Sequence, residues 1–555
     1  MTKKLRVYLA QLNATGGDVE GNINLLREAR GKANQEKSDI IIAPEMFVSG
    51  YPVDDLVLRK EFLKSIENEI TKIASETNDG GPAIIVGAPR INENKLRNSV
   101  YVLDQGKVIG VRDKAKLPNE DEFYDNRQFI PGDLPGPVLI RGVRVGLPIC
   151  QDLWDPEVCE CLLEAGAEII LSINGSPFNS KKYIQRLNAV ISRSKETNLP
   201  ITYLNLVGGQ DELLFDGGSF VLNEAGSLAC QMPMFETAGN HIDYLKSNNS
   251  WGCKNSIKVP CLEGDDALYN AILLSIKDYV RKNGFREVIL GLSGGIDSAL
   301  VAALSVDALG SENVKSFMLP SQFTSQSSLD DSKEISKRLN ISLESLSIIN
   351  AFEQINSSLK PLFKINKFDI TEENIQSRLR ALLLMAVSNK FGSMLISTSN
   401  KSEAAVGYST LYGDMSGGFA PLKDVWKTQV FELVKWRNSN KPKLSIFPSL
   451  NIIPKSVISK QPTAELRDNQ KDTDTLPDYS RLDKILSLAI EEMKSAKEIT
   501  DLGYEISEVK NVLRLLKISE YKRFQSPPGP KLGIKAFGRD RMYPLTNKFK
   551  SNLKG

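Results

Sequence analysis

The feature that most restricts the fold is the segment 287–303, which reads EVILGLSGGIDSALVAA. An apolar run breaks at the Ser-Gly-Gly of 293–295 and resumes with helical character around Asp297 and Ser298, which predicts a strand, a tight turn and a helix. Glycine lets the backbone approach a ligand closely, and the first N–H groups of a helix, which lack partners within it, favour an anion. We therefore expect a phosphate-binding turn in an α/β domain.

Two common nucleotide-binding motifs do not fit this turn. No Gly-Lys-Ser/Thr follows it, and the G-x-G-x-x-G pattern is missing. The string instead resembles the SGGxDS loop of enzymes that split ATP into AMP and pyrophosphate. A Gly-rich strand-to-helix turn without a ligand remains the alternative for Ser-Gly-Gly taken alone. The resemblance implies that ATP is held by Gly291, Leu292, Ser293, Gly294, Gly295, Ile296, Asp297 and Ser298.

Length and charge narrow the class of protein. A chain of 555 residues is too long for one ordinary core, so we expect about two to four domains. Lys+Arg number 70 and Asp+Glu 68, which argues against a nucleic-acid partner. No apolar stretch reaches the ~18 residues of a membrane helix, so we expect no membrane span and a cytoplasmic protein.

The histidine and cysteine counts restrict the chemistry further. A Cys-His or Ser-His pair could use only His241, which lies in the segment TAGNHID, where we expect a solvated loop. A catalytic nucleophile would therefore take a carboxylate as its base. The six cysteines lack paired C-x-x-C spacing, and none follows Cys261, so neither zinc nor a disulfide framework is indicated.

The apolar pattern divides the chain in two. It lapses between residues 235 and 265, and we place the boundary there, with domains 1–255 and 256–555. The first half alternates short β-rich runs with helical segments, as in a layered α/β domain. The second half predicts a parallel sheet with helices on both faces, preceded by a helix that begins at Asp265 and stops at Asn283-Gly284.

Three residues of the first half follow strand-like runs. Cys150 ends VRVGLPIC, Glu45 ends the run DIIIAPE, and Lys114 lies in RDKAKLPN. A cysteine at such a place often serves only in packing. With the other two beside it, a cation would favour the thiolate, and a carboxylate could take the proton during attack.

The strings PEMFVSGYP, KAKLPN and GLPICQDLW resemble the nitrilase (carbon–nitrogen hydrolase) superfamily. The resemblance implies a four-layer αββα sandwich in which Glu45 is the general base, Lys114 stabilises the oxyanion and Cys150 forms a thioester. The run NGSPF is similar to the segment that holds glutamine in this superfamily, which implicates Ser176 and Lys182. Two positions depart from the glutamine-hydrolysing relatives: Gln151 replaces a glutamate and Glu120 a tyrosine. We assign no glutamine contact to Glu120, for which a solvent-facing carboxylate is the alternative.

The second half carries further candidates. The segment 371–389 predicts a helix, with Asn374 and Arg378 together on a face separate from the buried one. A solvated polar face is the alternative for this pair. The buried stripe would be Ile375, Leu379, Leu382, Leu383 and Ala386. A strand is expected to end near Thr398, with Glu403 just beyond it. Because Mg²⁺ bound to ATP phosphates prefers carboxylate oxygens, Glu403 and Asp297 are the candidate metal ligands.

These strings, with GDMSGGFAPLKDVWKT and PTAELRDNQKD, resemble the ammonia-transferring domain of NAD⁺ synthetases, and the whole chain resembles the glutamine-dependent family. The resemblance implies a Rossmann-like adenine nucleotide α-hydrolase domain in which Thr398 also contacts ATP. It implies that Asn374, Glu403 and Lys522 bind deamido-NAD⁺; a solvated basic strip is the alternative for Lys522. The enzyme would be a carbon–nitrogen ligase that takes its amide nitrogen from glutamine and forms an acyl-adenylate, with Mg²⁺ accompanying ATP. It would be a homo-oligomer acting only on small molecules.

Other functions stay open at this point. The main alternative is a stand-alone amide hydrolase whose second domain only binds a nucleotide. tRNA thiolation enzymes share the SGGxDS loop but pass sulfur through nearby cysteines, which the second half lacks. A GMP-type synthetase would carry a Cys-His glutaminase, which a single histidine disfavours.

Overall fold

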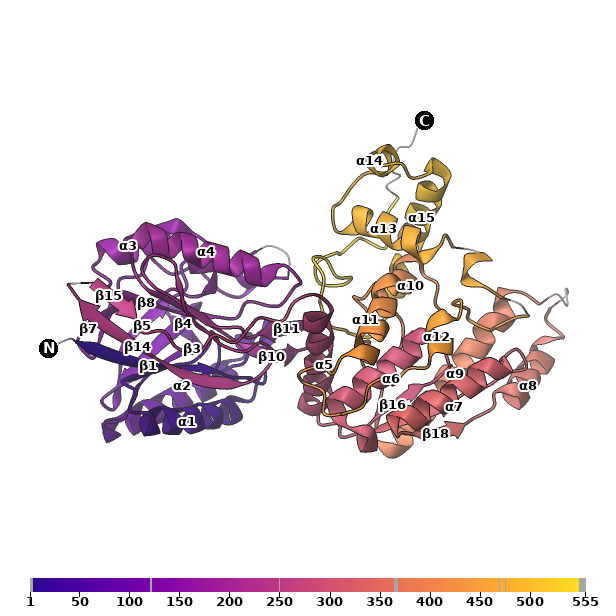
Figure 1. Cartoon of the computed structure of the whole chain (residues 1–555), viewed down its shortest axis with the longest axis horizontal. Coiled ribbons are helices and arrows are strands. Elements are labelled where there is room, and N and C mark those ends of the chain that lie inside the picture. Colours follow the sequence, from indigo (N-terminus) through magenta and orange to yellow (C-terminus); the bar gives the residue numbers. More distant parts are fainter. Residues whose placement is uncertain are drawn as a thin grey trace. The chain divides into compact units, whose positions relative to one another are not determined.

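The computed structural model describes residues 3–119, 122–248, 250–363, 368–468, 470–474 and 476–548. The chain divides into two compact units, Met1–Leu262 and Glu263–Gly555 (Figure 1). In the described part of the chain, no helix combines the length and the apolar character needed to cross a membrane.

Two sheets form the centre of the first unit. The larger has the strand order β15-β14-β1-β2-β3-β4-β5, the smaller has the order β13-β12-β9-β8-β7-β6, and β10 and β11 pair separately. The strands are β1 (Lys4–Gln11), β2 (Ile40–Ile42), β3 (Ala83–Asn92), β4 (Lys95–Asp104), β5 (Lys107–Asp113), β6 (Val138–Ile140), β7 (Val143–Gly146), β8 (Ile169–Asn174), β9 (Ile201–Asn205), β10 (Val207–Gln210), β11 (Leu213–Asp216), β12 (Phe220–Leu222), β13 (Leu228–Gln231), β14 (Ala238–Ser247) and β15 (Ser250–Cys253).

The alternation along each strand explains the layers. In β1, Val7 and Leu9 join the core between the sheets, whereas Tyr8 and Ala10 point to the other face. That outer face is covered by α1 (Val19–Gln35) and α2 (Lys60–Glu76). The smaller sheet is covered by α3 (Pro156–Glu164) and α4 (Lys182–Thr197), on the opposite side of the unit (Figure 1). The predicted αββα sandwich is confirmed.

The second unit contains a four-stranded parallel sheet of order β18-β17-β16-β19. Its strands are β16 (Val288–Gly291), β17 (Val314–Met318), β18 (Ser342–Ser345) and β19 (Met394–Leu395). Its helices are α5 (Gly264–Lys282), α6 (Ile296–Leu309), α7 (Gln326–Leu339), α8 (Ile349–Leu359), α9 (Ile370–Phe391), α10 (Lys401–Val406), α11 (Lys427–Ser439), α12 (Lys455–Ser459), α13 (Tyr479–Ile490), α14 (Ala496–Asp501), α15 (Ile506–Ile518) and α16 (Glu520–Arg523). The helices α10 and α13 to α15 share a core of their own, apart from the sheet.

Two local expectations are refined by the structure. The segment 235–265 contains β14 and β15, and His241 pairs with Tyr8 inside β14 rather than lying in a loop. One face of β14 is partly exposed and carries polar residues, so the strand does not stand out as an apolar run in the sequence. The strand expected to end near Thr398 ends at Leu395, and Ile396 beyond it makes an isolated bridge to Phe419.

The buried stripe of α9 is confirmed in part, because Leu379 is buried and Ile375 and Leu383 pack against the same apolar cluster. Leu382 and Ala386 are exposed, while the buried positions include Gln376, Ser377 and Leu384. The first half of the helix packs its polar side against loops: Gln376 Nε2 donates to the carbonyl of Leu466 at 2.9 Å. Hydrogen bonds to loops therefore bury polar positions of the helix beside its apolar stripe.

Candidate active sites

The first candidate site begins at a sharp turn after β7. Cys150 is buried, opens the 3-10 turn Cys150–Leu153 and has a φ of +47°, a value uncommon for residues other than glycine. The carboxylate of Asp152 holds this turn. Its Oδ2 accepts from the Ile149 N–H at 2.9 Å, and its Oδ1 accepts from the N–H groups of Ala115 and Lys116 at 3.0 and 2.8 Å. Asp152 therefore ties the cysteine turn to the backbone that follows Lys114.

Glu45 and Lys114 form a buried ion pair beside the cysteine. Lys114 Nζ lies 2.8 Å from Glu45 Oε1 and 3.1 Å from Asp125 Oδ2. Asn98 Nδ2 also donates to Glu45 Oε1, and the Gly175 N–H donates to Oε2 at 2.7 Å. Both the carboxylate and the ammonium act on the Cys150 thiol. The structure thus brings the three predicted residues together.

The Cys150 thiol is not a preformed thiolate. Burial, followed by the charge of Glu45, raises its pKa to about 12, and the opposing effect of Lys114 is smaller. As expected, the cationic Lys114 favours the thiolate, but desolvation and the charge of Glu45 outweigh it, so the net shift is upward. Burial also lowers the pKa of Lys114, but Asp125 and Glu45 raise it well above its usual value, so the lysine is a cation.

Two acids of this site escaped the pattern search. Asp125 is buried and accepts from Lys114 and from the Tyr51 hydroxyl, the latter at 3.0 Å. Asp152 lies inside the matched string GLPICQDLW, but only its contacts show what it does. Nothing in the spacing around Asp125 distinguishes it from a surface acid.

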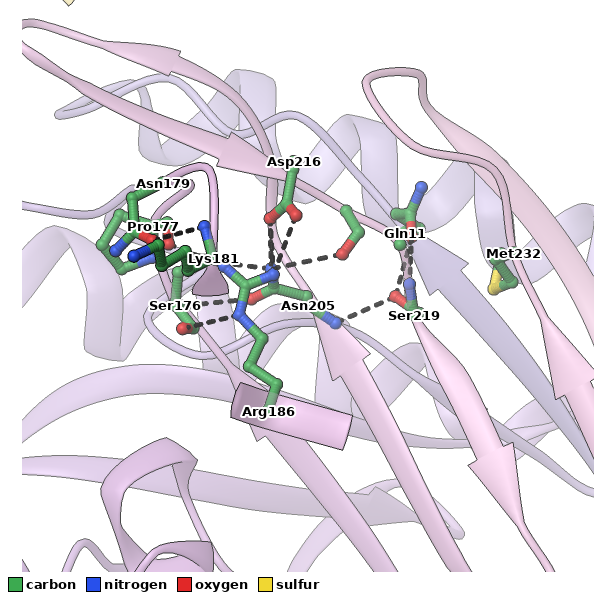
Figure 2. A network of polar contacts seen from close by, with 12 residues as sticks. Gln11, Ser176, Pro177, Asn179, Lys181, Arg186, Asn205, Asp216, Ser219 and Met232 are labelled. Carbon is green, nitrogen blue, oxygen red and sulfur yellow. Dashed lines mark hydrogen bonds and ion pairs between the residues drawn. The ribbon is translucent and has the colours of Figure 1, made fainter. Parts of the chain in front are cut away.

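The residues predicted to hold glutamine follow β8. Ser176 is buried and accepts from Arg186 Nε at 2.9 Å through its hydroxyl (Figure 2). Lys182 begins α4, and its Nζ lies 5.2 Å from the ring centre of Trp154, four residues after Cys150. Gln151 is half-buried in the cysteine turn, and Glu120 lies outside the described residues.

The second candidate site surrounds the turn between β16 and α6. The Ser293 N–H donates to Ser298 Oγ at 3.2 Å, and the Gly295 N–H donates to Ser293 Oγ at 3.2 Å. Gly294 has a φ of +78°, and a Cβ there would lie 2.4 Å from the carbonyl oxygen of Ser328. Only glycine fits this position, so the predicted strand, turn and helix are present with the tight packing that the motif requires.

A buried lysine joins the two predicted acids. Lys427, the first residue of α11, pairs with Asp297 Oδ2, and its Nζ lies 3.4 Å from Glu403 Oε1. Asn400 Nδ2 donates to Asp297 Oδ1 at 2.8 Å. Burial raises the pKa of Glu403 to about 8, although Lys427 opposes the shift. The sequence analysis did not identify Lys427.

Asp297 and Glu403 fit a Mg²⁺ ion bound together with phosphates. Both carboxylates reach the same ammonium group, so both can face a single cation. Among the described residues, no group of three or more Asp, Glu, His or Cys side chains is placed to hold a metal ion. Such a pair agrees with Mg²⁺, which usually takes one or two carboxylates and completes its shell with phosphate oxygens and water.

Two adjoining cavities meet at this turn. The larger, of about 350 Å³, is lined by Ser293, Gly295, Ile296, Asp297, Ser298, Asn374, Thr398, Glu403 and Lys522 among others. The smaller, of about 250 Å³, is lined by Gly291, Leu292, Ser293 and Thr398, with apolar walls that include Phe317 and Leu384. Gly294 lines neither. In the larger cavity, Asn374 Oδ1 accepts from the Thr410 hydroxyl, and Lys522 Nζ donates to the carbonyls of Gly407 and Ser409.

Comparison with known proteins covers both units. The carbon–nitrogen hydrolase family model matches residues 6–243, and the NAD synthase model matches residues 268–526. The glutamine-dependent NAD(+) synthetase of Rhodobacter capsulatus is 44% identical over 550 residues, 99% of this chain and 100% of the relative. That of Thermotoga maritima is 38% identical, with 99% and 100% covered.

A solved structure agrees along the whole chain. The glutamine-dependent NAD+ synthetase of Acinetobacter baumannii, determined in complex with ADP, is 37% identical with a TM-score of 0.78 and covers 99% of this chain and 100% of its own. Each unit contains one candidate site, and the chain matches these relatives over their full length. The chain belongs to the glutamine-dependent NAD⁺ synthetase family.

Proposed function

We propose that this protein amidates deamido-NAD⁺ to NAD⁺, consuming ATP and taking ammonia from glutamine. The observation that carries the proposal is the presence of two complete sites in one chain. One is the buried set Glu45–Lys114–Cys150, and the other is the turn 293–298 with Asp297 and Glu403 at adjoining cavities. A stand-alone amide hydrolase has no use for the second site.

In the first site, Cys150 attacks the side-chain amide carbon of glutamine. Its thiol is neutral near pH 7, because its pKa is about 12, so a base must take the proton as the C–S bond forms. Glu45 is that base, and it passes the proton to the departing ammonia. Lys114 stabilises the negative oxygen of the tetrahedral intermediate. Water then hydrolyses the thioester, while Ser176 and Lys182 hold the amino-acid end of glutamine.

In the second site, ATP spans the two cavities. The smaller, with its apolar walls, suits adenosine, and Thr398 and the turn residues line the passage to the larger one. The free N–H groups at the start of α6 favour the phosphates. The nicotinate carboxylate of deamido-NAD⁺, bound by Asn374, Glu403 and Lys522, attacks the α-phosphorus. An acyl-adenylate forms, pyrophosphate leaves, and ammonia displaces AMP.

A Mg²⁺ ion would be held by Asp297 and Glu403, and it would supply positive charge to the departing pyrophosphate. Lys427 supplies a second positive charge in the same place. Burial lowers its pKa, but Asp297 and Glu403 more than offset this, so the group stays protonated. The protein's own cation and the metal thus serve the same leaving group.

The proposal extends to assembly and compartment. We expect a cytoplasmic homo-oligomer. Its six cysteines are free thiols, and α9 exposes the apolar side chains of Leu382 and Met385 on one face, with Leu382 63% exposed. A second copy would cover this face. Light scattering on the wild type and on Leu382→Glu tests the assembly: a monomeric wild type would refute it.

The activity is tested with two ammonia sources. Mixing the protein with deamido-NAD⁺, ATP and Mg²⁺ should release pyrophosphate, and adding glutamine or ammonium should yield NAD⁺. Cys150→Ala should abolish glutamine-driven synthesis and leave ammonium-driven synthesis unchanged. Loss of both would refute the two-site scheme, and glutamine hydrolysis without pyrophosphate release would favour the stand-alone amide hydrolase.

A further inference from the structure

A buried arginine next to the first site makes most of its hydrogen bonds to one segment. Arg186, on α4, is 1% exposed. Its Nη1 donates to both oxygens of Asp216 at 2.7 and 2.9 Å. Its Nε donates to Ser176 Oγ, and its Nη2 donates to the carbonyls of Ser176 and Pro177 at 2.8 and 2.6 Å (Figure 2). Three of the five contacts therefore hold the segment 176–177.

The same segment is held from the other side by Asn205, at the end of β9. Its Oδ1 accepts from the Ser176 N–H at 2.9 Å, and its Nδ2 donates to the Ser176 carbonyl at 3.0 Å. The preceding residue, Gly175, donates its N–H to Glu45 Oε2. Any movement of Ser176 therefore moves a hydrogen bond of the proposed catalytic base.

Arg186 also fixes the Ser176 hydroxyl oxygen as a hydrogen-bond acceptor. A guanidinium can only donate, so Ser176 Oγ must accept from it and keeps its own proton for another partner. That proton can go to the Tyr203 hydroxyl, which interacts with the Ser176 side chain, or to an acceptor in the glutamine site. A substrate carboxylate is an acceptor that suits such a donor.

Stability does not explain why this ion pair is buried. A buried Arg–Asp pair is on average no more stabilising than apolar residues of the same volume, because both charges lose their hydration. Here burial raises the pKa of Asp216 despite the arginine beside it, whereas Asp216 keeps the pKa of Arg186 above its usual value although burial lowers it. The benefit lies in the hydrogen bonds that the pair provides to the segment 176–177.

We propose that Arg186, oriented by Asp216, is a positioning residue of the glutaminase site. It holds the segment 175–177 so that Gly175 meets Glu45, and it presents Ser176 as a donor to the amino-acid end of glutamine. The inference rests on the proposed roles of Glu45, Cys150 and Ser176. It adds a specific requirement for Arg186, which touches neither the substrate nor the thiol.

The test uses the full chain and compares glutamine with ammonium as nitrogen source. Arg186→Met alone leaves Asp216 as an unpaired buried charge and risks misfolding, so the decisive variant is R186M/D216N, which removes both charges. We expect kcat/KM for glutamine to fall about 100-fold, as for a misplacement near 1 Å, with a raised KM for glutamine. Ammonium-driven synthesis should keep its kcat and KM.

A matched control removes another Arg–Asp pair from the same unit. Arg6 and Asp243 make a two-bond contact at 2.7 and 3.1 Å between β1 and β14, and neither contacts the segment 175–177. R6M/D243N should keep the wild-type rate of NAD⁺ formation with glutamine and with ammonium. If it lowers glutamine use as much as R186M/D216N does, general destabilisation explains the loss and the inference is wrong.

A double-mutant cycle separates positioning from simple support of the fold. If Arg186 acts through Ser176, the R186M/D216N change should cost at least about fivefold less in a Ser176→Ala background than in the wild type. Equal losses in the two backgrounds overturn the inference, as does glutamine use within twofold of wild type in R186M/D216N. Cys150→Ala is measured alongside, since its failure would refute the proposed function irrespective of Arg186.

Discussion

Replacing Gly175 by alanine tests the geometry of the glutaminase site with one methyl group. A Cβ on Gly175 would lie 2.9 Å from Tyr51 Cδ1, 3.2 Å from Glu45 Oε2 and 3.3 Å from Leu206 Cδ1. All three neighbours are buried, so none can move into solvent. The φ of Gly175 is not left-handed, so the backbone itself tolerates alanine, and the cost comes from the contacts.

The magnitude follows from the crowding. Overpacking a buried site by a methyl group costs about 1–3 kcal/mol. If the Glu45 carboxylate moves away from the Gly175 N–H to relieve the crowding, the same free energy is added to the barrier of the step that Glu45 catalyses. Glutamine-driven kcat/KM then falls roughly 5- to 150-fold. Ammonium-driven synthesis does not use Glu45 and should be unchanged.

The assay is NAD⁺ formation with each nitrogen source, with Gly31→Ala as the control. A Cβ on Gly31 meets no atom within 4 Å, and alanine inside α1 should stabilise the helix by about 0.5–1 kcal/mol. Gly31→Ala should therefore raise the unfolding temperature and leave both reactions intact. Gly175→Ala with full glutamine-driven activity would show that Glu45 does not need this contact, and the assignment of the base would fail.

Three further predictions concern the second site and the pH dependence of stability. Gly294→Ala should abolish synthesis from both nitrogen sources, because its Cβ would meet the Ser328 carbonyl oxygen at 2.4 Å; retention of ammonium-driven activity would contradict the placement of the turn. Lys427→Met should lower ammonium-driven kcat by about 100-fold or more while glutamine hydrolysis persists, since Lys427 faces Asp297 and not the thiol site; an unchanged kcat would remove it from the site. Hydrogen bonds from Arg6 lower the pKa of Asp243 to about 2, so this carboxylate stabilises the fold above the unfolded pKa near 4, and the contribution is lost as the pH falls toward 2. The stability difference between wild type and Asp243→Asn, at most about 2 kcal/mol at pH 6, should shrink over that window in thermal unfolding, and a constant difference would refute the argument.

Local patterns were sufficient for the parts of the sites that are continuous in sequence. The turn 293–298 combines a strand ending, glycines and a helix start within one short string, so its conformation follows from neighbouring residues alone. The cysteine turn and the run after β8 are also short strings. Their assignment to chemistry, however, needed the family resemblance as well as the pattern.

Residues that act across long separations were missed for a physical reason. Lys427 reaches Asp297 across 130 residues, and Arg186 reaches Asp216 across 30, so no window of sequence contains both members of either pair. Asp125 was missed because a buried acid and a surface acid look alike until the packing is known. The burial of Gln376 on α9 was missed for the same reason, since the loop at Leu466 covers that side of the helix.

By itself, the sequence determined a layered α/β first unit and the parallel sheet of the second, because alternation, glycine placement and short motifs act over a few residues. The αββα sandwich and the chemistry of each unit followed from the family resemblance of those motifs. Tertiary structure alone decided the protonation of Cys150, the cation that faces Asp297 and Glu403, and the anchoring of Ser176 by Arg186. Each of these depends on burial and on charges brought together from distant segments. Desolvation and Coulomb interactions are properties of the folded environment, and the order of residues along the chain does not reveal them.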